Sequence, residues 1–126
     1  MKIIIAAALV ALASAAASHE MSPTYPILKP SYVDGVKTTE MVIINKREDI
    51  DYYSVNVFDK DWNPIKFVSD YPGVLHVRYM GKRVFKIYIR NKDANRAEYI
   101  CTKSKALKND PRTTSVTSRI CSRVSN

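Results

Sequence analysis

The sequence predicts an all-β protein that folds as an antiparallel sandwich or barrel. Short segments rich in Val, Ile, Tyr and Phe recur about every ten to fifteen residues, and polar or Gly/Pro-containing stretches separate them. Once an N-terminal leader is removed, about 108 of the 126 residues remain, which is the size of one ordinary domain. A chain of this length supports one hydrophobic core, and we expect a single domain.

The first segment has the composition of an export signal. Lys2 gives the positive start, residues 3–13 form an uncharged apolar run, and small residues around Ala15 suit a signal peptidase. A membrane anchor is the alternative, but the run is shorter than the about 20 apolar residues that span a bilayer. We therefore predict a signal peptide over residues 1–18 and one domain over residues 19–126, in a protein that is periplasmic or secreted.

The first strands of the predicted domain differ in their expected burial. Residues 24–32 contain Pro26 and Pro30, and proline cannot donate to a sheet ladder. This segment is therefore an edge strand or a strand that switches sheets. Residues 41–45 are apolar on both faces, as expected of a central strand.

The two clearest strands, residues 52–59 and 82–90, alternate between apolar and polar side chains. This period of two places one set of side chains in the core and the other toward solvent. The predicted core residues on these strands are Tyr53, Val55, Val57, Phe85, Ile87 and Ile89.

The remaining segments complete the β pattern. Residues 74–79 and 96–103 are predicted strands, and the polar residues 91–95 suit a short helix or a turn. Residues 113–124 are dense in Thr, Ser, Val and Ile, which favours a last strand. Three apolar residues in this segment are spaced four apart, which also suits a helix face.

Cys101 and Cys121 predict a structural disulfide. In an oxidising compartment, two cysteines in a small domain usually pair. A reactive thiol or a metal site is the alternative, but there is no Cys-x-x-Cys, and neither His19 nor His76 has ligand spacing to them. If Ile100 points inward, both sulfur atoms fall on the same outer face of adjacent strands.

The end of the chain is strongly basic and marks a candidate partner-binding region. The whole chain has a net charge of +8, which falls to about +7 when Lys2 leaves with the leader. Such an end can meet nucleic acid, anionic lipid or an acidic protein, and nucleic acid is the least expected of these for an exported protein. A solvated face that aids solubility is the simpler interpretation. The candidate residues are Lys103, Lys105, Lys108, Arg112, Arg119 and Ile120.

The sequence shows no catalytic constellation. His76 is the only histidine away from the predicted mature terminus, and it lies in a strand pattern that suits a structural or surface role. Asp59 and Asp61 suggest a calcium loop, but Lys60 and Pro64 interrupt the required pattern, so a charged turn is favoured. We predict no enzymatic activity, no metal and no cofactor.

Five pieces of the sequence occur in a familiar order. They are residues 32–35, 41–46, 53–65, 77–88 and 97–100, and the fourth contains Gly81 followed by alternating apolar residues. In this order they resemble the N-terminal immunoglobulin-like domain of the PapD-type periplasmic pilus chaperones. The resemblance implies an immunoglobulin-like β-sandwich of about seven strands. It also implies a disulfide between the last two strands, as in the family's long-loop members.

The sequence departs from that family in three ways. No counterpart of the second domain is found in these residues. Only Val116 and Ile120 could serve as apolar residues of a donated final strand, and Lys29 is the nearest match to the family's anchoring Arg and Lys pair. We therefore predict an exported, non-enzymatic protein-binding domain that acts through a sheet edge or surface on a protein partner, acidic if the basic end makes the contact. The alternative is a structural subunit of a surface or virion assembly. No nucleic acid and no stable membrane insertion after signal cleavage are expected.

Overall fold

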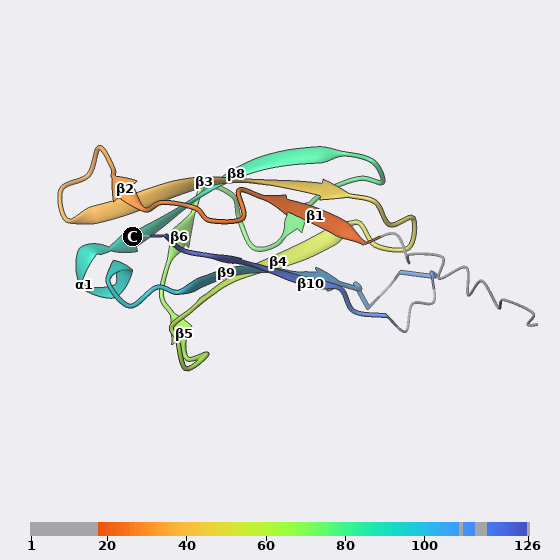
Figure 1. Ribbon diagram of the computed structural model, residues 1–126. Coiled ribbons are helices and arrows are strands. Elements are labelled where there is room, and N and C mark those ends of the chain that lie inside the picture. Colours follow the sequence, from red (N-terminus) through yellow and green to blue (C-terminus); the bar gives the residue numbers. More distant parts are fainter. Residues whose placement is uncertain (1–17, 109, 113–115, 126) are drawn as a thin grey trace, which may run out of the picture.

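Two antiparallel β-sheets pack face to face in the structure, a computed structural model that describes residues 18–108, 110–112 and 116–125 (Figure 1). The predicted signal peptide lies outside the described residues except for Ser18. The architecture confirms the predicted immunoglobulin-like β-sandwich. Its elements are β1 His19–Ser22, β2 Lys29–Pro30, β3 Val36–Asn45, β4 Tyr52–Phe58, β5 Pro64–Ile65, β6 Val68–Ser69, β7 Leu75–His76, β8 Lys82–Arg90, α1 Asn91–Ala94, β9 Tyr99–Lys105 and β10 Arg119–Arg123.

The strand order places β1 and β10 at one side of the sandwich. The first sheet runs β1-β3-β8-β6, and β2 also pairs with β3. The second sheet runs β10-β9-β4-β5, and β7 also pairs with β4. The sequence predicts about seven strands, and the described chain has ten because β2, β5, β6 and β7 are separate pieces of two residues each.

The core lies between the two sheets and confirms the predicted inner faces of β4 and β8. Apolar side chains at alternate positions meet there, as the period of two requires. The six predicted core residues are all buried, with Tyr53, Phe85 and Ile87 at 0% exposure, Val57 and Ile89 at 1%, and Val55 at 7%.

Asn45 is a fully buried polar residue at the end of β3. Its Nδ2 donates to the carbonyls of Ile50 at 2.6 Å and Val77 at 2.9 Å. Its Oδ1 accepts from the Tyr53 hydroxyl and from the Arg47 backbone N–H. Because a buried amide needs such partners, Asn45 fixes the loop that follows β3 and the position of Arg47.

The N-terminal segment crosses between the sheets. β1 pairs with β3 in the first sheet. The backbone N–H groups of Arg123 and Ser125 then donate to the carbonyls of Thr24 and Pro26, at 3.0 and 2.8 Å, in the second sheet. β2 returns to pair with β3. This confirms the sheet-switching interpretation of residues 24–32, whereas β1 itself was not predicted.

Two strand predictions were too long. The predicted strand at residues 74–79 contains only β7, Leu75–His76. The predicted strand at residues 113–124 is reduced to β10, Arg119–Arg123, and residues 113–115 lie outside the described part of the chain. Of the short helix or turn predicted at residues 91–95, the structure has the helix, α1. Within the described residues, no helix is long and apolar enough to cross a membrane.

Candidate partner-binding site at the open edge of the last strand

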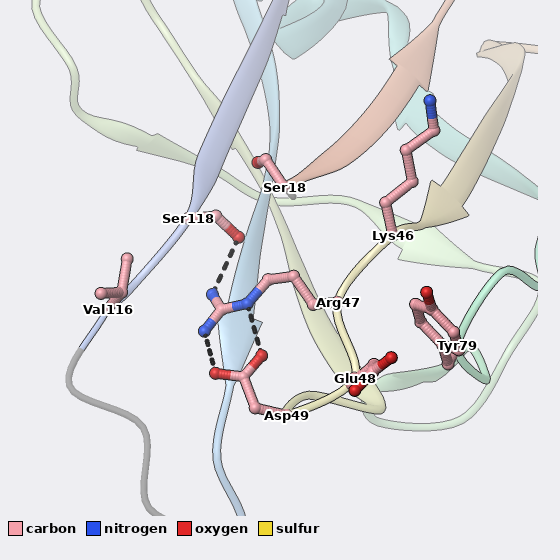
Figure 2. Close-up of a pocket in the computed structure, with 8 residues that line it drawn as sticks. All are labelled: Ser18, Lys46, Arg47, Glu48, Asp49, Tyr79, Val116 and Ser118. Carbon is pink, nitrogen blue, oxygen red and sulfur yellow. Dashed lines mark hydrogen bonds and ion pairs between the residues drawn. The ribbon is translucent and has the colours of Figure 1, made fainter. Parts of the chain in front are cut away.

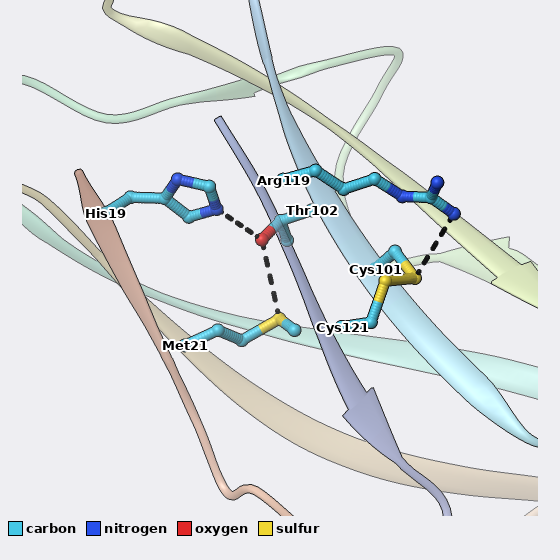
Figure 3. The surroundings of a disulfide bond; sticks show 6 residues. All are labelled: His19, Met21, Cys101, Thr102, Arg119 and Cys121. Atoms are coloured by element: carbon cyan, nitrogen blue, oxygen red, sulfur yellow. Dashed lines mark hydrogen bonds between the residues drawn. A yellow bond between two sulfur atoms is a disulfide. The ribbon is translucent and has the colours of Figure 1, made fainter. Parts of the chain in front are cut away.

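The disulfide joins β10 to β9. Cys121 lies directly opposite Cys101 in the register, with Cα atoms 4.0 Å apart, and the bond between them confirms the predicted pairing (Figure 3). Cys101 shares a groove with outer-face side chains such as Asn56 and Lys103, so it points outward as predicted. It is nevertheless only 2% exposed, because other side chains cover it.

The outer edge of β10 is covered over only part of its length. Two backbone hydrogen bonds toward β9 flank β10. The Ser104 N–H donates to the Ser118 carbonyl just before the strand, and the Val124 N–H donates to the Glu98 carbonyl just after it. In an antiparallel ladder, alternate residues bond to the same neighbour, so the N–H groups of Arg119 and Cys121 point away from β9. The segment at residues 24–27 covers this edge only at Arg123 and beyond.

β10 is the edge strand of the second sheet, so no further strand of this sheet pairs with its outer side at Arg119 and Cys121. Unpaired backbone donors and acceptors at a sheet edge form a template for another extended segment. Ile120, a predicted site residue, lies between them, and its backbone faces β9. Its half-buried side chain lines a groove of about 340 Å³ along β1, together with Met21 and Ile44.

Three predicted lysines flank this edge with uncompensated charge. Lys103 and Lys105 are exposed on β9, and Lys108 is exposed in the loop that follows. Within the described residues, none of the three forms an ion pair. Their positive field therefore reaches solvent beside the open part of β10.

Arg112, by contrast, is neutralised by its neighbours. Its guanidinium forms ion pairs with Asp110 and with Asp51, the latter at 2.9 Å, and it donates to the Glu48 carbonyl at 2.8 Å. The hydrogen bonds that the Arg112 guanidinium and backbone N–H donate to Asp110 lower the pKa of this carboxyl to about 2. Arg112 therefore holds the basic loop against the loop after β3, and it adds little positive charge for a partner.

Arg119 lies on the outer face over aromatic rings. Its guanidinium carbon is 5.0 Å from the centroids of both Phe58 and Trp62, and its Nη2 is 3.8 Å from the Cys101 sulfur (Figure 3). Trp62 stacks on Tyr99 with centroids 4.1 Å apart. These side chains explain the burial of Cys101. Sequence reasoning missed this cluster, since Trp62 lies in a hairpin far from the cysteines along the chain.

A buried polar cluster lies beneath β10. The His19 ring on β1 places Nε2 2.8 Å from the Thr102 hydroxyl (Figure 3). Its Nδ1 lies 3.0 Å from the Ser118 hydroxyl. His19 is 2% exposed, and burial lowers its pKa to about 4. These contacts tie β1 of one sheet to β9 and to the start of β10 in the other. Sequence reasoning missed them because they join residues 83 and 99 positions apart.

Arg47 extends this cluster to the surface. Its Nε and Nη2 donate to the two carboxylate oxygens of Asp49 at 2.9 and 2.7 Å, and its Nη1 is 3.3 Å from the Ser118 hydroxyl (Figure 2). A pocket of about 530 Å³ opens here, also lined by Lys46, Glu48 and Tyr79. Since the Arg47 guanidinium is committed to Asp49, the pocket offers mixed and largely compensated charge.

The cluster does not have the geometry of a catalytic triad. His19 rather than His76 approaches a serine, but its second ring nitrogen meets the Thr102 hydroxyl instead of a carboxylate. The acid that orients the base in a Ser-His-Asp triad is therefore missing from this contact. Within the described residues, no group of three or more His, Cys, Asp or Glu side chains could hold a metal ion. The absence of enzymatic activity, metal and cofactor stays a prediction.

Comparisons with known proteins identify a fold. No family model matches the chain, and no curated protein matches it. A solved structure, the crystal structure of the E. coli chaperone DraB, is similar with a TM-score of 0.60 at 17% sequence identity, covering 86% of this chain. The match covers 53% of that chain, so this chain spans about half of its length. At this identity the likeness shows the fold alone, and it supports a PapD-like immunoglobulin fold.

Proposed function

We propose that this chain is a protein-binding domain, chaperone-like in the sense that it pairs an extended segment of another protein with the open edge of β10. The observation that carries the proposal is the pair of outward N–H groups at Arg119 and Cys121, which the segment at residues 24–27 leaves uncovered. Addition of a strand to such an edge gives affinity through backbone hydrogen bonds. The structure similar to this chain is that of a chaperone, which supports a protein-binding role in general.

The surroundings of the edge favour an acidic partner. An added strand would place alternate side chains on the outer face, near Arg119 and Lys103, and the others toward the groove that Ile120 lines. Acidic residues on one side and aliphatic residues on the other match this arrangement. The three exposed lysines would speed the encounter with such a segment.

We also propose that the protein is exported and works in the periplasm or outside the cell. The disulfide supports this location, because such bonds persist in oxidising compartments. The mass of the mature protein tests it, and we expect the loss of about 17 residues from the start of the chain. Recovery of the full-length chain would contradict export with cleavage.

Two matched variants test the edge with a labelled peptide of alternating valine and glutamate. Arg119→Pro and Arg119→Ala remove the same charge, but only proline also removes the outward N–H. We expect Arg119→Ala to weaken binding modestly and Arg119→Pro to abolish it, measured by fluorescence anisotropy. Circular dichroism and thermal unfolding confirm that both variants are folded. If the two folded variants bind the peptide equally, the peptide does not pair with the outer edge of β10.

Charge reversal separates the electrostatic effect on the association rate from the backbone pairing of the peptide with β10. Replacement of Lys103, Lys105 and Lys108 by Glu should slow association by about tenfold or more and reduce its dependence on salt. Dissociation should change less, because the backbone ladder remains. The alternative of a structural subunit predicts self-association without peptide, which sedimentation of the parent protein would reveal.

A further inference from the structure

A second groove lies at the side of the sandwich opposite β1 and β10. It forms where the chain passes from β5 of the second sheet to β6 of the first, and its volume is about 530 Å³. Its apolar surface comes from Phe67 and Val68 together with Tyr88 on β8. Val68 is paired opposite Tyr88 and is 69% exposed.

The apolar surface extends beyond the groove to a loop tip. Tyr32, in the loop between β2 and β3, is 89% exposed. Its ring meets the Tyr88 ring edge to face, with centroids 6.4 Å apart. In Figure 1 this loop and α1 lie at the same end of the molecule. Tyr32, Tyr88 and Val68 thus form a connected patch of largely unburied apolar side chains.

Three cations surround the patch. Lys66, Arg90 and Lys92 line the groove, and all three are exposed. Within the described part of the chain, none of them forms an ion pair. The one acid that lines the groove, Asp93, is bound by Arg96 at 2.8 Å. The groove therefore has a net positive charge beside exposed apolar rings.

We propose that this face, formed by Tyr32, Val68, Lys66, Arg90 and Lys92, docks the folded protein on an anionic lipid surface. Each Lys or Arg beside an anionic bilayer increases the affinity of a protein for that bilayer. Tyrosine is enriched at the boundary between headgroups and acyl chains. Tyr32 and Val68 project from a loop tip and an edge strand, which suits shallow insertion. An acidic protein is the competing partner, but the high exposure of Tyr32 and Val68, at 89% and 69%, favours insertion into a bilayer. The site is distinct from the β10 edge and would leave that edge free.

The test measures co-sedimentation of the mature protein with vesicles of phosphatidylcholine alone or mixed with phosphatidylglycerol. We expect binding only to the mixed vesicles. Replacement of Lys66, Arg90 and Lys92 by Glu should lower partitioning by about 100-fold or more. The matched control replaces Lys103, Lys105 and Lys108 by Glu, which changes the net charge equally and should cost only a few-fold.

A second pair of variants tests the apolar contribution. Tyr32→Ser with Val68→Ser should weaken vesicle binding several-fold at unchanged charge, whereas Val84→Ser, at another exposed position on β8, should not. No binding to the mixed vesicles, or an equal loss in both charge-reversed variants, would overturn the proposal. Binding of this groove to soluble polyglutamate but not to vesicles would instead assign it to an acidic protein. Peptide binding at β10 should survive the groove variants, so the two proposals fail independently.

Discussion

Strands β8 and β10 show how differently two strands of one sandwich are built. β8 lies between β3 and β6 and buries Phe85, Ile87 and Ile89 at exposures of 1% or less. Among the labelled strands β10 pairs with β9 alone, and the polar Ser122 is its one buried residue. A strand held on both sides contributes to the core, whereas a strand held on one side keeps backbone groups for a partner.

The difference predicts that stability depends on β8 and binding depends on β10. β8 is fixed by apolar burial, and its ladder with β3 runs along its entire length. β10 is instead fixed by a covalent bond, by the crossing segment at residues 24–27 and by the polar cluster around His19. These attachments hold the strand in place while its outer edge remains open at Arg119 and Cys121.

The largest expected effect is the loss of a core side chain on β8. Phe85 is fully buried and meets Tyr71 edge to face at 6.0 Å. Phe85→Ala should lower the free energy of unfolding by about 3 to 5 kcal/mol. Ile120→Ala on β10, at a half-buried position, should cost less than about 2 kcal/mol. Chemical denaturation of both variants checks the ranking, and equal losses would remove the contrast.

Loss of the disulfide should have the next largest effect. The bond closes a loop with a sequence separation of 20, for which chain entropy gives about 3 kcal/mol. Cys101→Ala with Cys121→Ala should therefore lower stability by about 2 to 4 kcal/mol while the circular dichroism spectrum persists. Unchanged stability would show that the other attachments of β10 suffice. Unfolded, unreduced parent protein should show no reactive thiol.

Acid should weaken the attachment of β1 to β9 and β10 through His19. Its pKa is lowered from 6.5 to about 4 in the folded protein by burial, so the unfolded chain binds a proton more readily between these values. Stability contributed by neutral His19 is therefore complete above about pH 6.5 and is lost as the pH falls toward 4, by at most about 3 kcal/mol.

Comparison of two histidine variants isolates this effect. His19→Gln should flatten the pH dependence of unfolding between about pH 5 and 6.5, where few carboxylates titrate. His76→Gln is the matched control for the loss of a histidine, because His76 is exposed and stacks on Tyr52 at the surface, away from the His19 contacts. If the pH dependence of His19→Gln equals that of the parent, the buried contact does not control acid stability.

Strands with strong alternation could be predicted from the sequence, and strands fixed by tertiary contacts could not. β8 was predicted with its correct bounds because its apolar residues recur every second position. β1 has no such pattern in residues 19–22, and its conformation comes from pairing with β3. The strand predicted at residues 113–124 was too long for a related reason. β-branched composition favours a strand, but only the contacts with β9 determine where its pairing begins.

The candidate site was predictable in chemistry but not in arrangement. The cysteine pair and the exposed lysines follow from the sequence. The ion pair of Arg112 with Asp51, and the aromatic cover over Cys101, depend on contacts between distant segments. Which backbone groups of β10 stay open also depends on the register with β9 and on the path of residues 24–27.

Amide hydrogen exchange of β10 tests the central claim most directly. In the free protein, the Arg119 and Cys121 amides should exchange fast, whereas the Ser122 amide, which faces β9, should be protected. Addition of the valine–glutamate peptide should slow exchange at Arg119 and Cys121 and leave Ser122 nearly unchanged. If the peptide binds while both outward amides keep their fast exchange, strand addition at β10 is wrong.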